Sequence, residues 1–377
     1  MTGLIDSDAA LVAAVEALAR APALALDTES DAYFAYRARV CLLQLSTPEA
    51  EFLVDPLAPL DLAPLGRLLA DPAREVVIHA AENDVIMMRH QFGWRIGRLF
   101  DTQVASFALG LKPYSLAGIL EARFGLKLDK KLQRSDWSRR PLDPAQMEYA
   151  LADTRHLLAL AEDLHRRVAE AGRIEEVESE CARIAAREWT PDPPDPEAFR
   201  RLAATRELDP VQLRIWRDLH FWREKEAERT NRAPYRIADD AALLSIARAR
   251  AKGPVRGVPR RIWDRHGRRF VGIVDAALAA GPLTLPRIRR ERGEPPTREV
   301  KERFDRLRAW RTEAATARGV EPFVVARNEA LFEVAQRGCR TLAELGEVLE
   351  PFRVREYGDA LLAAMLASPP RPPHNKN

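Results

Sequence analysis

The segment Ala23-Leu24-Ala25-Leu26-Asp27-Thr28-Glu29-Ser30 is a short apolar run that ends abruptly in acidic and hydroxyl side chains. Such a run is typical of a buried strand, and the polar residues mark the place where the strand reaches solvent. Because side chains alternate along a strand, Asp27 and Glu29 would point to the same face. The segment therefore predicts a buried strand with two carboxylates at its polar end.

The residues around this strand predict an α/β domain. Apolar spacing predicts helices over 7–20, 62–69 and 147–164, strands over 40–45, 51–54 and 75–79, and a mostly helical chain from Val85 onward. Three strands in close succession, followed by strands interleaved with helices, favour a mixed sheet that helices cover.

An internal repeat lies between and after two proline-rich segments. Residues 190–196 cannot sustain a helix or strand and predict a linker, and 281–299 is a second candidate. Five positions recur 88 residues later: Pro234, Asp240, Leu243, Ile246 and Ala247 as Pro322, Asn328, Leu331, Val334 and Ala335. Trp216-Arg217 is matched to Trp310-Arg311. Two copies are too few for a solenoid, so they predict a tandem of small helical domains.

The composition excludes several classes of protein. The chain has 377 residues, of which 46% are hydrophobic and 31% charged, and is too apolar for a disordered chain. No apolar run reaches the length of a membrane span, and the first residues lack the order of a signal peptide, so we expect a cytoplasmic protein. Three cysteines lie too far apart for a disulfide scaffold or a zinc finger: Cys41, Cys181 and Cys339.

The net charge of +3 conceals an uneven distribution. Residues 1–190 hold 22 Lys and Arg against 29 Asp and Glu, whereas residues 191–377 hold 37 against 27. A basic half suggests an acidic partner, with nucleic acid first among them. On this observation alone, an arginine-rich composition that scatters charge without purpose remains the alternative.

Four acidic residues occupy positions where apolar elements meet loops: Asp27, Glu29, Asp84 and Asp153. Clustered carboxylates repel one another and supply the oxygen ligands that hard divalent cations need. Two such cations activate a water and stabilise the leaving oxygen of a phosphodiester. Each acid taken singly is more often a helix cap or a turn residue, so the prediction depends on the whole set.

The segments that carry these acids resemble the ribonuclease D branch of the DEDD 3′-to-5′ exonucleases. The similarity lies in the motifs Leu26-Asp27-Thr28-Glu29, His79-Ala80-Ala81-Glu82-Asn83-Asp84 and Tyr149-Ala150-Leu151-Ala152-Asp153, in the second strand over 37–46, and in the connecting region over 115–142. The resemblance implies that Asp27, Glu29, Asp84 and Asp153 hold two divalent cations, Mg²⁺ or Mn²⁺. Glu82 remains an alternative to Asp84 as the ligand from the second motif.

Tyr149 distinguishes between the histidine and tyrosine variants of the superfamily that the chain resembles. The histidine variant of the superfamily has His five residues before the last Asp, where this chain has Glu148. Tyr149 lies one helical turn before Asp153 and would share its face, which implies the DEDDy type. A phenol is a poor base at neutral pH, so we expect it to position the attacking water. The alternative is that Tyr149 only packs in the core, on the apolar face of an amphipathic helix.

The repeat resembles the HRDC domain, a small helical bundle shared by ribonuclease D and RecQ-type helicases. The two resemblances imply an α/β, ribonuclease H-like mixed-sheet exonuclease domain followed by two small all-α HRDC bundles. The implied segments are the exonuclease domain 1–187, a Pro/Asp-rich linker 188–204, a first HRDC domain 205–285, a basic linker 286–297, a second HRDC-like domain 298–366 and a tail 367–377. Trp216 and Trp310 have apolar neighbours and are expected in the cores.

Two basic clusters are candidate RNA-binding surfaces. Beside the predicted active site, a channel for a single-stranded 3′ end would need positive walls and an aromatic side chain, which points to Lys131, Arg134, Trp137, Arg139 and Arg140. A second set would bind phosphate in the first repeat: Arg256, Arg260, Arg261, Arg268 and Arg269. The alternative is that these basic residues form an ordinary helix surface that contacts only solvent.

The resemblance implies a metal-dependent 3′-to-5′ exoribonuclease that trims structured RNA such as precursor tRNA and releases nucleoside 5′-monophosphates. One alternative is a 3′-to-5′ DNA exonuclease in repair, with single-stranded DNA as partner. Another is a non-catalytic RNA-binding scaffold. These motifs do not distinguish ribose from deoxyribose. We expect neither a membrane nor ATP as partner, because the sequence lacks a Gly-x4-Gly-Lys-Ser/Thr phosphate loop.

Overall fold

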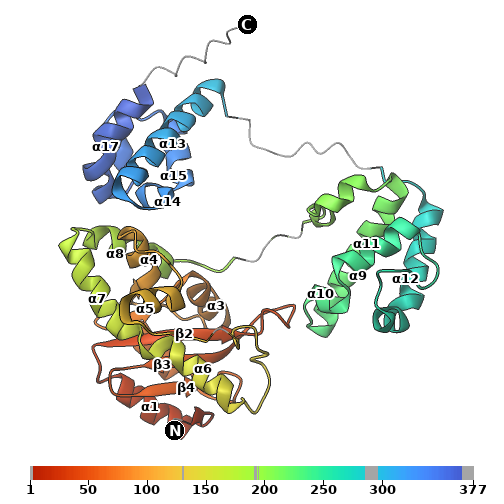
Figure 1. Ribbon diagram of the computed structural model, residues 1–377, viewed down its shortest axis with the longest axis horizontal. Helices are drawn as coiled ribbons and strands as arrows, with labels where there is room; N and C mark the ends of the chain where they lie inside the picture. Colours follow the sequence, from red (N-terminus) through yellow and green to blue (C-terminus); the bar gives the residue numbers. More distant parts are fainter. Residues whose placement is uncertain (1–2, 130, 191–192, 194, 285–295, 367–377) are drawn as a thin grey trace.

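The computed structural model describes residues 3–129, 131–190, 193, 195–284 and 296–366, which form an α/β domain followed by two helical bundles (Figure 1). Each part has its own buried apolar cluster, so the predicted fold class is confirmed. The predicted domain bounds stay predictions. Most of the linker over 286–297 and all of the tail over 367–377 lie outside the described residues.

A six-stranded mixed sheet forms the centre of the α/β domain, in the order β1-β4-β3-β2-β5-β6. Its strands are β1 (Leu4–Ile5), β2 (Ala23–Ser30), β3 (Val40–Ser46), β4 (Glu51–Val54), β5 (Glu75–Ile78) and β6 (Arg98–Asp101). The strands β2, β3 and β4 pair antiparallel, whereas β5 and β6 extend the β2 side in parallel. Every strand from β2 to β5 matches a predicted strand, but β1 and β6 were not predicted.

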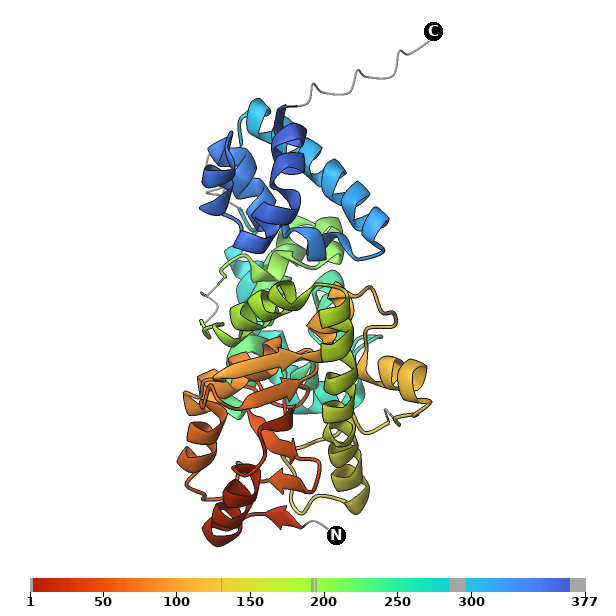
Figure 2. The ribbon, with the colours of Figure 1, turned by 90° about the vertical axis from the view of Figure 1, so that its left-hand side faces the viewer.

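Helices flank both faces of this sheet (Figure 2). They are α1 (Asp8–Leu18), α2 (Ala63–Leu69), α3 (Glu82–Phe92), α4 (Thr102–Ala108), α5 (Leu116–Phe124), α6 (Pro144–Arg155), α7 (Leu157–Glu170) and α8 (Ile174–Ala185). The prediction of one helix over 147–164 is wrong, because the helix breaks at His156 into α6 and α7. The break lets α6 contact β2, β3 and β4 while α7 contacts β2 and β5.

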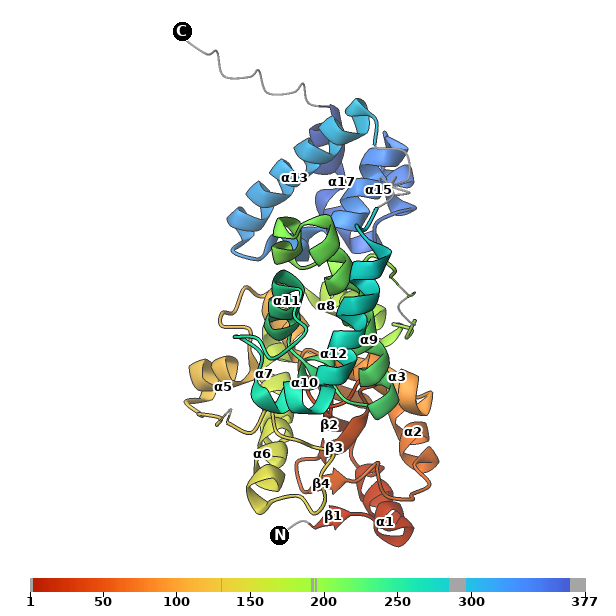
Figure 3. The same ribbon diagram turned by 90° about the vertical axis from the view of Figure 1, so that its right-hand side faces the viewer.

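The first three helices of the two bundles repeat at a uniform offset of 88 residues. The first bundle contains α9 (Pro210–Thr230), α10 (Pro234–Ile237), α11 (Asp240–Ala249) and α12 (Arg260–Ala280), and the second bundle contains α13 (Arg298–Arg318), α14 (Pro322–Val325), α15 (Asn328–Arg337), α16 (Leu342–Gly346) and α17 (Pro351–Leu366). In the first bundle α9 contacts α10, α11 and α12 (Figure 3). The bounds of the first three helices coincide at this offset, so the predicted tandem is confirmed.

A buried arginine occupies the same place in both bundles. Arg223 donates through Nη1 to a backbone carbonyl and to Oδ1 of Asp240, the latter at 2.6 Å. Arg311, 88 positions later, makes the equivalent bonds to a carbonyl and to Oδ1 of Asn328, the latter at 2.9 Å. Each bond ties the long first helix to the start of the third, so the repeat is preserved in contacts as well as in helix bounds.

This arginine corrects one match made on the sequence. Trp310-Arg311 corresponds to Trp222-Arg223 and not to Trp216-Arg217, since only the former keeps the offset of 88. Trp216 is 1% exposed in the first core, as predicted, and donates through Nε1 to the carbonyl of Phe199 at 2.6 Å. Trp310 is half-buried and packs edge to face on Tyr357. Both indoles therefore serve the cores of their bundles.

The connecting segment before α6 is anchored in a small second core of the α/β domain. Trp137 is 1% exposed and packs with Leu142 and with residues of β3 and β4. Arg140 makes two bonds of 2.6 Å to the carboxylate of Asp55 and a third to the carbonyl of Cys41 at 2.7 Å. The prediction of Trp137 as an RNA-binding residue is wrong, because the indole has no exposed face for a base. The Arg140 side chain is still 25% exposed, so its RNA-binding role stays a prediction.

Replacing Arg140 with alanine should lower the free energy of unfolding by about 2 kcal/mol. The Asp55 side chain is only 6% exposed and would lose its cationic partner inside the protein. Arg139→Ala is the matched control, because the Arg139 side chain is 81% exposed and its loss should cost less than about 0.5 kcal/mol. Urea unfolding measures both variants, and equal losses would contradict the anchoring role of Arg140.

Candidate active site

All five predicted catalytic residues line one cavity of about 350 Å³ in the α/β domain. Asp27 and Glu29 come from β2, Asp84 from α3, and Tyr149 and Asp153 from α6. Residues more than 120 positions apart therefore meet in one place, although their chemical roles stay predictions.

The position of β2 explains why two of the acids reach the cavity. The strand lies between β3 and β5, and Leu24 and Leu26 are fully buried. Pairing with β5 covers only residues 23–25, whereas pairing with β3 continues beyond them. The end of β2 is therefore open on the β5 side, and Asp27 and Glu29, two residues apart, lie on the same face there.

Asp84 is positioned by a loop that Asp101 holds in place. Asp101 is 1% exposed, and its side chain accepts from the backbone N–H of Ala80 at 3.0 Å, of Ala81 at 2.8 Å and of Gln103 at 2.8 Å. Ala80 has a φ of 60°, a left-handed conformation that alanine rarely adopts. The bonds to Asp101 offset this strain and fix the start of α3, close to Asp84.

Six polar residues of the cavity were not predicted as site residues: Thr28, His79, Gln103, Ser115, Asp129 and Gln133. The Thr28 hydroxyl donates to Oδ1 of Asp84 at 2.5 Å and so ties β2 to α3. His79 Nδ1 lies 2.9 Å from the Thr102 hydroxyl, and burial lowers the His79 pKa to about 4, so the imidazole is neutral at pH 7. Thr28 and His79 lie inside the quoted motifs, whereas Gln103 follows β6, which the sequence did not reveal.

Burial and mutual repulsion raise the pKa of the acids in this cavity. For Asp27 burial raises the pKa most, followed by the charges of Asp84, Asp153 and Glu29. Burial and then the charges of Asp153 and Asp84 raise the pKa of Glu29 to about 9. Burial also raises the pKa of Asp84 and that of Asp153 to about 6. The four groups are therefore close enough to oppose one another's ionisation.

Tyr149 is a hydrogen-bond donor at neutral pH. Burial raises its pKa far above the ordinary value, and the charges of Asp153, Glu29 and Asp27 raise it further. The phenol therefore stays protonated, and it can orient a water or a phosphate oxygen without removing a proton. Its ring lies 6.0 Å from that of Trp137, which anchors it in the domain.

Glu82 faces away from the acids. Its carboxylate pairs with Arg187 at 3.0 Å and with Arg183 at 3.8 Å, and it lines a different cavity. Asp84, two residues later on α3, lines the same cavity as Asp27. Of the two alternatives left open by the sequence, the geometry favours Asp84.

The donor set suits a hard divalent cation. It consists of four buried or half-buried carboxylates, and their mutual repulsion is what a bound cation would relieve. Over the ranges that the structure describes, no group of three or more His, Cys, Asp or Glu side chains has the spacing of a preformed metal site. The residues therefore fit divalent cations by their chemistry and charge, without a closed coordination shell.

The connecting segment reaches the cavity through Leu128 and Gln133. Lys131, Arg134 and Arg139 are exposed on the same segment, where the sequence predicted a basic wall. Five further arginines are exposed on α12 or just before it: Arg256, Arg260, Arg261, Arg268 and Arg269. They belong to the first bundle, and Figure 1 shows α12 on the side of that bundle away from the α/β domain. The RNA-binding role of both sets stays a prediction.

Known proteins resemble the chain over nearly its whole length. A 3′-5′ exonuclease family model matches residues 3–169, and an HRDC domain model matches 212–274 and 300–365. The chain is 33% identical to ribonuclease D of Gluconacetobacter diazotrophicus over 374 residues, which cover 96% of this chain and 92% of that protein. It is 32% identical to ribonuclease D of Acidiphilium cryptum, and the similar region covers 95% of this chain and 92% of that protein.

Solved structures are similar in fold. Escherichia coli RNase D has a TM-score of 0.63 and 25% identity, with 98% of this chain and 100% of that chain covered. The catalytic core of RRP6 from Trypanosoma brucei has a TM-score of 0.69 and 26% identity, and the similarity covers 74% of this chain and 81% of that chain. In the described part of the chain, every helix is too short or too polar to cross a membrane. The domains, their order and these relatives agree that the chain belongs to the ribonuclease D family of 3′-to-5′ exoribonucleases.

Proposed function

We propose that this exoribonuclease trims the 3′ ends of structured RNA, such as precursor tRNA, in the cytoplasm and releases nucleoside 5′-monophosphates. The observation that carries the proposal is the convergence of four carboxylates and a protonated phenol on one cavity. The structure of the E. coli relative is described as that of an exoribonuclease involved in structured RNA processing, which supports the same substrate class here.

In this proposal Asp27, Glu29, Asp84 and Asp153 hold two divalent cations, Mg²⁺ or Mn²⁺. When bound, the cations would supply a water of lowered pKa and charge stabilisation for the leaving 3′ oxygen. The phenol of Tyr149 donates a hydrogen bond that orients the attacking water. Asp101 acts through Asp84, because it fixes the loop on which α3 begins.

The RNA would bind along two basic surfaces. Lys131, Arg134 and Arg139 would guide the 3′ end into the cavity, and the exposed arginines of the first bundle would hold the folded body of the RNA. Guanidinium groups match phosphate geometry, and each phosphate contact makes binding weaker as salt rises.

A denaturing-gel time course tests the proposed activity. The substrates are 5′-labelled precursor tRNA with a 3′ extension and a matched single-stranded DNA, each with Mg²⁺, Mn²⁺ or EDTA. We expect the RNA to shorten from its 3′ end only when a divalent cation is present. Comparable shortening of DNA would favour the repair exonuclease, and tRNA binding without shortening would favour the scaffold.

Substitution of the acids should stop cleavage while leaving RNA binding in place. We expect Asp27→Asn, Asp84→Asn and Asp153→Asn each to lower kcat by about 1000-fold or more, because each removes a charge that holds a cation. Tyr149→Phe keeps the ring and loses only the hydroxyl, so a loss of about 100-fold is expected.

Glu82→Gln is the matched control for Asp84→Asn, because Glu82 lies two residues away and pairs with arginines outside the cavity. Single-turnover cleavage and filter binding, measured on the same variants, separate chemistry from affinity. A kcat for Glu82→Gln as low as that for Asp84→Asn would contradict the assignment of Asp84.

The raised pKa values predict that the metal-free protein loses stability as pH rises. Glu29 has a pKa of about 9 in the folded protein and an ordinary value of 4.5. Between these values the folded state keeps a proton that the unfolded state has released, so the cost of folding grows with pH. Glu29→Gln should therefore stabilise the metal-free protein at pH 8 by about 2 kcal/mol and flatten this pH dependence.

Thermal unfolding in EDTA and in Mg²⁺ from pH 5 to pH 9 measures this effect. Mg²⁺ should stabilise the wild-type protein more than it stabilises the Glu29→Gln variant, because a cation that binds only the folded state adds to its stability. A melting temperature of the metal-free wild type that does not fall over this range would show that the carboxylates do not repel one another as described.

Four exposed arginines of α12 should contribute to binding of structured RNA. Their joint replacement by alanine should weaken affinity for tRNA by about tenfold or more and lower the slope of log Kd against log salt by roughly 3. The variant replaces Arg260, Arg261, Arg268 and Arg269, and the control replaces four exposed arginines of the α/β domain: Arg20, Arg67, Arg95 and Arg98. Equal salt slopes in the two variants would contradict a role for α12.

A further inference from the structure

The two bundles approach the α/β domain with the same turn. This turn follows the long first helix of each bundle. Taken together with the first residues of the short second helix, it covers residues 231–236 (turn T1) and 319–324 (turn T2). At the offset of 88, Tyr235 corresponds to Phe323. Both side chains are large, hydrophobic and exposed, by 53% and 42%. An apolar side chain at the tip of a turn suits a contact with another surface.

Turn T1 contacts the loop between β2 and β3, residues 31–39. The backbone N–H of Ala233 donates to the carbonyl of Phe34 at 2.9 Å. The Tyr235 hydroxyl donates to the carbonyl of Tyr33 at 2.5 Å. Figure 1 shows this loop extending from the sheet towards α10. The tip of T1 therefore binds the backbone of a loop that begins where β2 ends.

Charged groups surround this contact. The Arg236 guanidinium lies 4.0 Å over the ring of Phe34. Arg37 pairs with Glu228 at 2.6 Å, and its backbone N–H donates to Oδ1 of Asn231 at 3.0 Å. The side chains of the ion pair are 77% and 50% exposed, so solvent weakens their attraction. The T1 contact is polar and open to water.

Turn T2 contacts α4 and the residues that follow it. The ring of Phe323 meets that of Phe107 edge to face, with centroids 4.9 Å apart. Glu321 pairs with Lys112 at 2.8 Å. The carbonyl of Gly319 comes so close to Gly110 that a Cβ there would lie 2.5 Å from it. The equivalent turn of the second bundle thus binds a different part of the α/β domain, with apolar packing at its centre.

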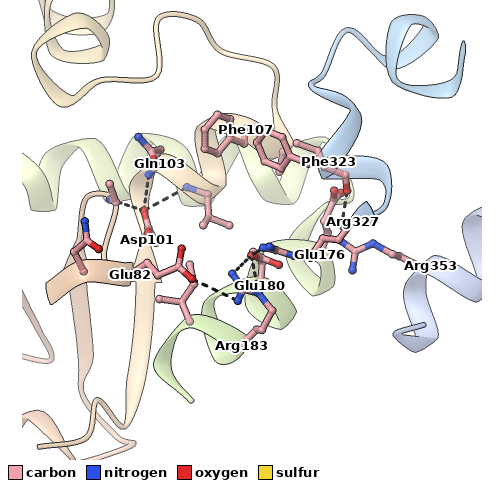
Figure 4. Close-up of a pocket in the computed structure, with 16 residues that line it drawn as sticks. Glu82, Asp101, Gln103, Phe107, Glu176, Glu180, Arg183, Phe323, Arg327 and Arg353 are labelled. Carbon is pink, nitrogen blue, oxygen red and sulfur yellow. Dashed lines mark hydrogen bonds and ion pairs between the residues drawn. The ribbon is translucent and has the colours of Figure 1, made fainter. Parts of the chain in front are cut away.

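Ion pairs with α8 strengthen the T2 contact. Arg318 pairs with Glu176 at 2.7 Å, and the two side chains are only 13% and 6% exposed. Arg327 pairs with Glu180 on the same helix. Glu176, Glu180 and Arg327 line a cavity of about 360 Å³, and Figure 4 shows arginines and carboxylates facing one another across it. Each arginine that lines the cavity pairs with a carboxylate, so the cavity is a gap within the interface.

From this equivalence we infer that the turn is a duplicated attachment element, through which each HRDC bundle binds the exonuclease domain of its own chain. Tyr235 and Phe323 make the central contact in the two copies. The second bundle is held by apolar packing and buried ion pairs, and the first by exposed polar contacts. The first bundle is therefore the one that detaches more readily. The inference concerns domain attachment and holds whichever RNA the enzyme trims.

Both receiving segments connect directly to elements that line the active-site cavity, and α4 lines it itself through Gln103. The loop over 31–39 follows β2, and α4 follows Asp101, which holds the loop before Asp84. Attachment through T1 leaves α12 on the side of the first bundle that faces away from the exonuclease domain (Figure 1). The exposed arginines of that helix thus stay open for RNA while the bundle is attached.

Cysteine cross-linking in the full-length protein tests the inference, because the native cysteines are buried. One pair, Phe34→Cys with Ala233→Cys, joins T1 to its loop, and another, Phe107→Cys with Phe323→Cys, joins T2 to α4. The swapped pairs, Phe34→Cys with Phe323→Cys and Phe107→Cys with Ala233→Cys, use the same four substitutions and are the matched controls.

Under a mild oxidant such as diamide, the native pairs should form disulfides at least about tenfold faster than the swapped pairs, since only neighbouring Cβ atoms can be bridged. A mobility shift on non-reducing denaturing gels measures the rates. Tyr235→Ala should slow the T1 pair about fivefold and leave the T2 pair unchanged. Equal rates for native and swapped pairs would overturn the inference.

Charge reversal tests T1 without touching packed residues. At low ionic strength, Arg37→Glu or Glu228→Arg should raise the radius of gyration in small-angle scattering, and the double reversal should restore it. Lys252→Glu, whose partner Asp275 lies 2.7 Å away in the same bundle, is the control and should change nothing. Single reversals that scatter like the wild type would overturn attachment through T1.

Discussion

Repulsion among the carboxylates of one cavity is the constraint on which the rest of the structure depends. Asp84, Asp153 and Glu29 each oppose the ionisation of Asp27, and burial adds to the cost. A fold that brings these groups together must be stabilised elsewhere, and the central strand β2 with its fully buried apolar half supplies part of that stability. A cation that offsets the repulsion would serve both the chemistry and the fold, so stability and activity should respond to the same ion.

The support for the acids comes from bonds that join neighbouring elements. Asp101 ties the end of β6 to the loop before α3, and Thr28 ties β2 to α3. The elements that carry these bonds also lead into the segments that receive the two bundles, which are the loop over 31–39 and α4. The bundles are therefore attached to the outer ends of the framework that positions the acids.

The sequence predicted the central features because they are local. The apolar run that ends at Asp27 and the one-turn spacing of Tyr149 and Asp153 can be read without a partner. Other features depend on tertiary contacts. Trp137 is an indole in a basic segment, and only its packing against β3 and β4 shows that it is buried. The role of Arg140 depends on Asp55, 85 residues away in the sequence.

The match between the two repeats also depended on tertiary contacts that the sequence does not show. Two Trp-Arg pairs lie six residues apart on α9, and both fit the pattern of an amphipathic helix. Only the bonds of the arginine to the next helix identify Trp222-Arg223 as the equivalent of Trp310-Arg311. Strand β6 was missed because four residues between helices carry little pattern. Asp101, the last residue of β6, was missed for the same reason. Its role depends on the backbone N–H groups that it binds, and these cannot be identified from the sequence.

A crystal structure with Mn²⁺, measured for anomalous scattering, tests the carboxylate site most directly. We expect anomalous density inside the cavity, within about 2.3 Å of carboxylate oxygens from Asp27, Asp84 and Asp153. Asp27→Asn should remove this density while the fold is preserved. Density beside Glu82, or an empty cavity in crystals of protein that cleaves RNA with Mn²⁺, would show that these carboxylates do not hold the cation.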